Sequence, residues 1–195
     1  MKILGLTGGI GMGKSTAAAA FRRAHLPVFD ADVAVHRMQA RGGRAVRAIG
    51  AAFPGTVRNG TVDRAALRMA VLGKPNALTK LEHILHPMVR EEERRFIARA
   101  RRAGSRAVVL DIPLLLETDD IERVDLIVVV SAPRAVQMHR VRQRRRMSAA
   151  DIAAVIARQM PDAEKRRRAD VVVHTGLSRY HALRLLRRLI RQILA

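Results

Sequence analysis

Short apolar runs alternate with longer stretches of helical periodicity along this chain. Five runs rich in Val, Leu and Ile predict strands at Ile3–Leu6, Val28–Phe29 running into Asp30, Ala107–Leu110, Leu126–Val130 and Val171–Val173. The third and fourth are almost continuously apolar, which is typical of strands covered on both faces in a parallel sheet. The pattern therefore predicts an α/β protein of doubly wound architecture.

Helical segments separate most of these strands. They are predicted at Thr16–His25, Arg134–Arg145, Ser148–Arg158 and Arg179–Leu194. In the last of them, apolar residues recur at helical spacing, so one face of that helix is expected to be buried.

A glycine-rich loop follows the first strand. It reads Gly8-Gly9-Ile10-Gly11-Met12-Gly13-Lys14-Ser15, which has the form G-x-x-x-x-G-K-[S/T], and a helix-forming segment comes directly after it. In this setting backbone N–H groups and the helix N-terminus surround phosphate oxygens. Lys14 is expected to reach the β- and γ-phosphates, and the Ser15 hydroxyl to coordinate Mg²⁺. The loop therefore predicts binding of a nucleoside triphosphate.

About 70 residues separate the second and third strands, far more than one crossover helix needs. Helices are predicted there at Asp32–Ala40, Asp63–Leu72 and Pro75–Arg102, with turns at Gly42-Gly43 and Pro54-Gly55. We interpret the interval as a helical insertion for a second substrate. A purely structural elaboration is the alternative. Within the last helix, His86-Pro87 is interpreted as a helix terminus, because proline disfavours helix in the residue before it.

Composition narrows the class of protein. The chain has 195 residues and no cysteine, which excludes disulfides and thiolate metal sites, and no apolar run approaches the roughly 20 residues that span a bilayer. We expect a cytoplasmic protein without a membrane partner. The formal charge of +20 favours nucleic acid or phosphorylated small molecules as partners. The scarcity of aromatic residues argues against a protein that binds single-stranded nucleic acid. Most of the arginines are interpreted as lying on solvated helix faces.

Acidic residues follow two of the predicted strands. Asp30 and Asp32 follow the second strand, where a carboxylate can accept a proton from a substrate hydroxyl or bind Mg²⁺ through water. Capping of the next helix by Asp32 is an equally good interpretation. Asp111 ends the third strand as a carboxylate that would support Mg²⁺. Pro113 and Leu114 begin the apolar wall that comes after it.

Arginines are dense between the fourth and fifth strands. Arg140 and Arg144 are four residues apart and share one face of the predicted helix. A lid over residues 134–158 would exclude water and neutralise transition-state charge, with Arg140 directed at the phosphates. A solvated basic helix is the alternative, and it is the better interpretation for most of these arginines.

The chain resembles the dephospho-coenzyme A kinases along essentially its whole length, because several segments match that family in the same order. The matching segments are Gly5–Ser15, Asp30-Ala31-Asp32, Leu81–Pro87, Asp111–Glu117, Gln137 with Arg140 and Arg144, and Gln159 with Lys165 and Ala169-Asp170. The resemblance implies a P-loop kinase fold with a five-stranded parallel core in residues 1–32 and 103–195, a helical substrate subdomain in residues 33–102, and a lid.

The resemblance also implies an activity, the transfer of the γ-phosphoryl group of ATP to the ribose 3′-hydroxyl of dephospho-CoA. Asp32 falls on the general base, and His86 on a residue with a substrate-side or domain-organising role. Residues 11–16 fall on the ATP loop, namely Gly11, Met12, Gly13, Lys14, Ser15 and Thr16. Asp111, Pro113 and Leu114 are expected on the substrate side, with Ser15 and Asp111 at the metal. Arg140, Arg144 and Thr175 are expected at the nucleotide, Thr175 through its backbone groups.

Three positions depart from the family pattern: Met12 replaces serine, Arg146 replaces glycine and His174 replaces asparagine. A monomer or small homo-oligomer without a specific nucleic-acid partner is expected. Two alternatives remain. A nucleoside or nucleotide kinase of the same fold differs in its acceptor, and an ATP-dependent nucleic-acid-binding protein is supported by the charge alone.

Overall fold

The computed structural model describes residues 1–117, 121–145, 152, 156–157 and 159–194. The chain forms two compact units, one made of residues 1–29 and 99–195 and the other of residues 30–98. Within the described ranges, no helix is long and apolar enough to cross a membrane.

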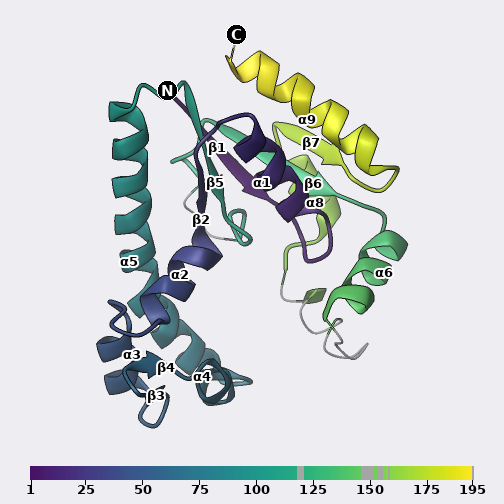
Figure 1. Cartoon of the computed structure of the whole chain (residues 1–195). Helices are drawn as coiled ribbons and strands as arrows, with labels where there is room; N and C mark the ends of the chain where they lie inside the picture. The colour runs from purple at the N-terminus through teal and green to yellow at the C-terminus, as the bar shows by residue number, and fades with distance from the viewer. Residues whose placement is uncertain (118–120, 146–151, 153–155, 158, 195) are drawn as a thin grey trace. The chain divides into compact units, whose positions relative to one another are not determined.

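A five-stranded sheet forms the centre of the first unit (Figure 1). Its strands are β1 (Lys2–Thr7), β2 (Val28–Asp30), β5 (Ala107–Asp111), β6 (Leu126–Ser131) and β7 (Val171–His174), in the order β2-β5-β1-β6-β7. Strand β1 pairs in parallel with β5 and with β6, and β6 pairs in parallel with β7. All five predicted strands are confirmed, and the glycine-loop strand β1 lies in the middle.

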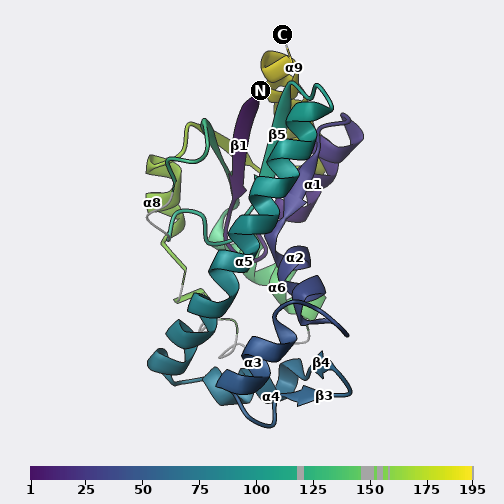
Figure 2. The same cartoon turned by 90° about the vertical axis from the view of Figure 1, so that its left-hand side faces the viewer.

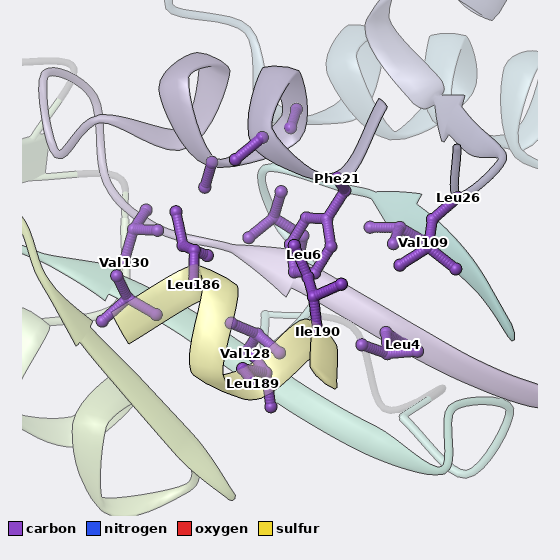
Figure 3. Close-up of a cluster of buried hydrophobic side chains, with 14 of the residues drawn as sticks. Leu4, Leu6, Phe21, Leu26, Val109, Val128, Val130, Leu186, Leu189 and Ile190 are labelled. Carbon is purple, nitrogen blue, oxygen red and sulfur yellow. The ribbon is translucent and has the colours of Figure 1, made fainter. Parts of the chain in front are cut away.

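Helices cover both faces of this sheet, which is why strands β5 and β6 are apolar up to their last residues. Helices α1 (Lys14–Arg23) and α9 (Arg179–Leu194) pack over one face, where Phe21 and Leu186 lie among the buried side chains of β1 and β6 (Figure 3). Helix α8 (Asp162–Arg167) lies on the side of β1 opposite to α1 (Figure 2). Along β6, Val128 and Val130 belong to the first cluster, and Ile127 and Val129 to a second cluster on the other face.

The second unit contains mostly helices. They are α2 (Ala31–Gln39), α3 (Val46–Ala52), α4 (Arg64–Val71) and most of α5 (Pro75–Arg102), with a hairpin of β3 (Val57–Arg58) and β4 (Thr61–Val62) between α3 and α4. The predicted helices are confirmed to within two residues at either end. Helix α3 and the hairpin were not predicted. The hairpin had a sequence signal, since Asn59 and Gly60 both take positive φ, 50° and 72°, as a two-residue turn requires.

The prediction that a helix ends at His86-Pro87 is wrong, because α5 continues through both residues. Proline lacks the N–H of an interior helical position, and this costs about 3 kcal/mol. The preference is local, and Pro87 is the only proline inside the 28-residue helix, since Pro75 stands at its first position. The remaining helical residues outweigh the local penalty.

The segment predicted to form a lid, residues 134–158, is described in part. Helix α6 (Arg134–Arg145) has the predicted bounds. Arg146 and most of the helix predicted at Ser148–Arg158 lie outside the described residues. The short helix α8 was not predicted from the sequence.

Candidate active site

The glycine-rich loop connects β1 to α1, and its backbone conformation requires glycine. Gly11 and Gly13 have φ of 75° and 98°, which side-chain-bearing residues rarely adopt. A Cβ at Gly11 would also lie 2.6 Å from Cγ2 of Val141 in α6. Met12, one of the departures from the family pattern, is buried, and its sulfur accepts a hydrogen bond from the Ala132 N–H at 3.1 Å. Its side chain therefore packs into the protein.

Lys14 and Asp111 meet beneath this loop although 97 positions separate them in the sequence. Lys14 Nζ lies 2.5 Å from Asp111 Oδ1, and the two side chains are only 17% and 4% exposed. The contact arises because β5 lies beside β1, with Leu6 opposite Asp111 in the register. The sheet thus brings the predicted loop cation and the predicted strand-end carboxylate together.

Arg140 and Thr175 form a second contact at the loop. Arg140 donates from Nη2 to the Thr175 carbonyl at 2.6 Å and from Nη1 to Thr175 Oγ1 at 3.0 Å. The Thr175 hydroxyl donates to the Met12 carbonyl at 2.6 Å. Helix α6, the residue after β7 and the loop are therefore joined through hydrogen bonds to backbone groups.

A cavity of about 330 Å³ opens beside this contact. Its lining combines a polar part, Thr16, Arg140 and Thr175, with an apolar part, and the full set is Gly13, Thr16, Ala17, Arg140, Thr175, Ala182 and Leu186. Small-molecule sites of roughly 300–1,000 Å³ usually have this mixed lining. The cavity can take a flat, partly polar ring next to a phosphate-binding loop. His174, the residue before Thr175, has an exposed side chain.

Metal-binding groups near the loop are few. Ser15 lies exposed in the first turn of α1, and Asp111 is buried at the end of β5. No group of three or more His, Cys, Asp or Glu residues gathers as a metal site in the described part of the chain. Ser15 and Asp111 are suited to a Mg²⁺ ion that keeps several waters and takes its other ligands from substrate phosphates.

Pro113 and Leu114 follow β5. The Pro113 carbonyl accepts a hydrogen bond from the Thr7 hydroxyl at 2.9 Å, and the Leu114 side chain is 44% exposed. The backbone of Arg144 lies in α6, and its side chain lies outside the described part of the structure.

Two other predicted site residues, Asp32 and His86, belong to the second unit. Asp30, not Asp32, caps helix α2, because its Oδ1 accepts a hydrogen bond from the Val33 N–H at 3.0 Å. The capping interpretation of Asp32 is therefore wrong. Asp32 lies exposed in the first turn of α2, and its carboxylate has no hydrogen bond or ion pair with other described residues. His86 is exposed on α5.

Two glutamines contact the loop in a way the sequence did not indicate. Gln137 and Gln159 both hydrogen-bond to the backbone of Ile10. In the sequence, only the family resemblance points to these two residues. No spacing rule connects positions 10, 137 and 159, so only the folded chain shows the contact.

A parallel sheet with the loop strand in its middle, a glycine-rich loop leading into α1 and a lysine paired with a strand-end acid define the class of P-loop kinases. The family model for dephospho-CoA kinase matches residues 2–178. The chain therefore belongs to the dephospho-CoA kinase family, and it is a kinase of coenzyme A biosynthesis. The expected fold and family are both confirmed.

Similar proteins agree with this assignment. A dephospho-CoA kinase of Gluconobacter oxydans (strain 621H) is 51% identical over 197 residues, which cover 99% of this chain and 98% of that protein. The structure of TT1252 from Thermus thermophilus has a TM-score of 0.85 at 34% identity, over 100% of this chain and 98% of that one. Dephospho-CoA kinase from Campylobacter jejuni shares the fold, with a TM-score of 0.67 at 21% identity over 98% and 97% of the two chains.

Proposed function

We propose that this kinase transfers the γ-phosphoryl group of ATP to the ribose 3′-hydroxyl of dephospho-CoA and releases coenzyme A and ADP. The observation that carries the proposal is the Lys14–Asp111 pair beneath the glycine loop, in a chain of the dephospho-CoA kinase family. In the reaction the bond between the γ-phosphorus and the β,γ-bridging oxygen breaks. A bond from the ribose oxygen to that phosphorus forms, and the hydroxyl proton passes to a base.

The loop and its neighbours would hold the triphosphate. Backbone N–H groups of residues 11–16, from Gly11 to Thr16, would donate to the phosphate oxygens, and Lys14 would neutralise charge on the β- and γ-phosphates. Ser15 and Asp111 would hold Mg²⁺. When bound, the metal would supply charge neutralisation on the β- and γ-phosphates. Lys14 and Asp111 already lie together, so the cation and the metal-binding carboxylate are preorganised.

On the acceptor side, Asp32 would be the general base. Its exposed carboxylate has no described partner and is free of the capping role that Asp30 fills, so it is available to accept the ribose proton. His86, Pro113 and Leu114 would contact dephospho-CoA. The exposed apolar side chain of Leu114 is suited to covering an organic substrate.

On the nucleotide side, the cavity beside Thr175 would take the adenine ring. Arg140 lies at the cavity and within hydrogen-bonding distance of the loop residue Gly11, whose carbonyl is 3.5 Å from Nη1. From this position Arg140 would neutralise charge that develops during transfer, and Arg144 on the same helix would also serve the nucleotide. The enzyme would be cytoplasmic and would have no nucleic-acid partner.

A coupled assay of ADP release tests the function, with dephospho-CoA, adenosine and nucleoside monophosphates as acceptors and with Mg²⁺ present or chelated. We expect turnover with dephospho-CoA only, dependent on Mg²⁺. Phosphorus NMR of the product is expected to show a new 3′-monophosphate. Turnover with adenosine or a nucleoside monophosphate but not with dephospho-CoA would instead make the protein a nucleoside or nucleotide kinase of the same fold.

A further inference from the structure

Ile10, inside the phosphate-binding loop, has both of its backbone polar groups bound by glutamine side chains. Its N–H donates to Gln159 Oε1 at 3.0 Å, and its carbonyl accepts from Gln137 Nε2 at 2.8 Å. The same two amide groups converge on the preceding residue. A Cβ at Gly9 would lie 3.3 Å from Gln159 Oε1 and 3.4 Å from Gln137 Nε2. The two glutamines therefore enclose this part of the loop.

The two side chains use opposite ends of the amide. An N–H requires an oxygen acceptor, so Gln159 must present its carbonyl oxygen, and a carbonyl requires a donor, so Gln137 must present its NH₂ group. A carboxylate can replace the amide at position 159 and still accept. It cannot replace the amide at position 137, because it has no proton to donate.

Each glutamine is held in place from outside the loop. Gln137 is buried in the first turn of α6, where its own N–H bonds to the Pro133 carbonyl. The residue after Gln159 is anchored as well, since the Met160 N–H donates to Glu117 Oε1 at 3.0 Å. That oxygen lies 2.7 Å from Nζ of Lys165, which is only 1% exposed.

The Glu117–Lys165 ion pair gives this anchor its strength. Removing one partner of a buried pair leaves an uncompensated charge, so such a pair resists rearrangement. Glu117 also follows β5, whose last residue, Asp111, pairs with Lys14. The loop is thus fixed at Ile10 to two segments of the chain. In the sequence, one ends with Gln137, just before residues 138–158, and the other begins with Gln159, just after them.

We propose that Gln137 and Gln159 are positioning residues that hold the phosphate-binding loop in its ATP-binding conformation. The proposal rests on the proposed function for the identity of the nucleotide. Neither glutamine needs to contact phosphate. With glycines on both sides of Ile10, the freed loop has many other conformations, and the apparent dissociation constant rises as the competent fraction falls.

This role has a specific kinetic signature. Loss of loop positioning raises KM for ATP, whereas kcat at saturating ATP and KM for dephospho-CoA stay close to wild type. General damage to the fold acts differently, because it lowers the active fraction, and hence kcat, at unchanged KM.

The first test uses Gln137→Met and Gln159→Met, which keep the side-chain volume and remove the hydrogen bonds. We expect an increase of about tenfold in KM for ATP for each, and a matching loss of ATP affinity by calorimetry. The double variant should lose less than the product of the two single effects, because both side chains hold one residue. Gln192→Met, at an exposed position of α9, is the matched control. A fall in kcat with unchanged KM for ATP overturns the proposal.

The second test uses the direction of the two bonds. Gln159→Glu keeps an acceptor for the Ile10 N–H, whereas Gln137→Glu sets a carboxylate against the Ile10 carbonyl. Both variants add one negative charge beside the same residue, so charge alone gives equal effects. We expect a several-fold higher KM for ATP in Gln137→Glu than in Gln159→Glu, and equal values overturn the assigned roles. A wild-type protein that binds no ATP would disprove the proposed function itself. ATP-binding variants that all behave like Gln192→Met would disprove only the glutamine proposal.

Discussion

Two aspartates separated by a single residue have different surroundings in this protein. Asp30 accepts the Val33 N–H and stabilises the start of α2, whereas Asp32 is exposed within the first helical turn. An N-cap contributes about 1 kcal/mol to stability, while a general base contributes to rate alone. The two residues can therefore be separated experimentally.

We predict that Asp32→Asn abolishes phosphoryl transfer with little change in thermal stability or ATP binding. The amide cannot take the ribose proton, and no described contact of the carboxylate is lost. The matched variant Asp30→Ala is expected to lose about 1 kcal/mol of stability through the cap. Turnover assays with calorimetric unfolding curves separate the two effects. A fully active Asp32→Asn enzyme would remove Asp32 from the mechanism.

Lys14 combines stability and chemistry in one side chain. Lys14→Ala is expected to lower kcat/KM by about 10²-fold or more, because charge on the β- and γ-phosphates loses its compensation. It also leaves Asp111 buried without its lysine, and breaking a buried pair costs about 3 kcal/mol or more. The double variant Lys14→Ala with Asp111→Asn is expected to regain stability and stay inactive. Recovery of activity together with stability would show that Lys14 acts only through the fold.

At the scale of elements, helix α6 presents arginines to different surroundings. Arg140 is half-buried against Thr175 and the loop, whereas Arg142, two positions further on, is exposed. Residues two apart point to different sides of a helix, so the dense arginines of this segment do not share one role.

We predict that Arg140→Ala lowers kcat by about 10³-fold, as transition-state arginines can, whereas Arg142→Ala costs little. Arg140→Lys is expected to restore only part of the loss, because lysine cannot reproduce the two-nitrogen contact with Thr175. Kinetics of the three variants, with circular dichroism as the control for folding, test this. Equal small losses would mean that Lys14 and Mg²⁺ neutralise the transition state alone.

Helix α5 is joined to the segment before α3 by charge. Glu91 pairs with Arg44 and with Arg95 one turn along its own helix. The hydrogen bond from Arg44, followed by the charges of Arg44, Arg95 and Arg94, holds the pKa of Glu91 below its ordinary 4.5. The ion pairs of Glu91 therefore stabilise the fold above pH 4.5, the ordinary pKa of the group. Their contribution to the free energy of unfolding is lost as the pH falls through the lowered pKa.

Glu91→Gln is expected to reduce stability slightly at neutral pH and to flatten the stability–pH curve below pH 4.5. Glu92→Gln is the matched control, since Glu92 has no ion pair among the described residues. Urea unfolding between pH 3 and 7 measures both variants. Parallel curves for wild type and Glu91→Gln would show that the exposed pairs contribute nothing.

For the whole molecule, local patterns predicted most of the helices and strands, but they did not predict which of these elements lie next to one another. The apolar runs located all five strands, and α6 and α9 have the predicted bounds. Helix α3, the Asn59-Gly60 hairpin and α8 were missed because short elements leave weak periodicity. The helix end predicted at Pro87 was wrong for the opposite reason, since a strong local preference was outweighed by the rest of a long helix.

Local sequence patterns are enough to predict the phosphate-binding loop, the acids at the strand ends and the α/β class, because glycine conformation, strand burial and helical spacing are local properties. Which of these residues contact one another depends on how the elements pack in the folded chain. The order β2-β5-β1-β6-β7 brings Lys14 to Asp111. Packing against the loop brings Gln137 and Gln159 to Ile10, and Arg140 to Thr175. These contacts join positions about a hundred or more residues apart, or a few tens in the case of Arg140 and Thr175, and no local rule relates them.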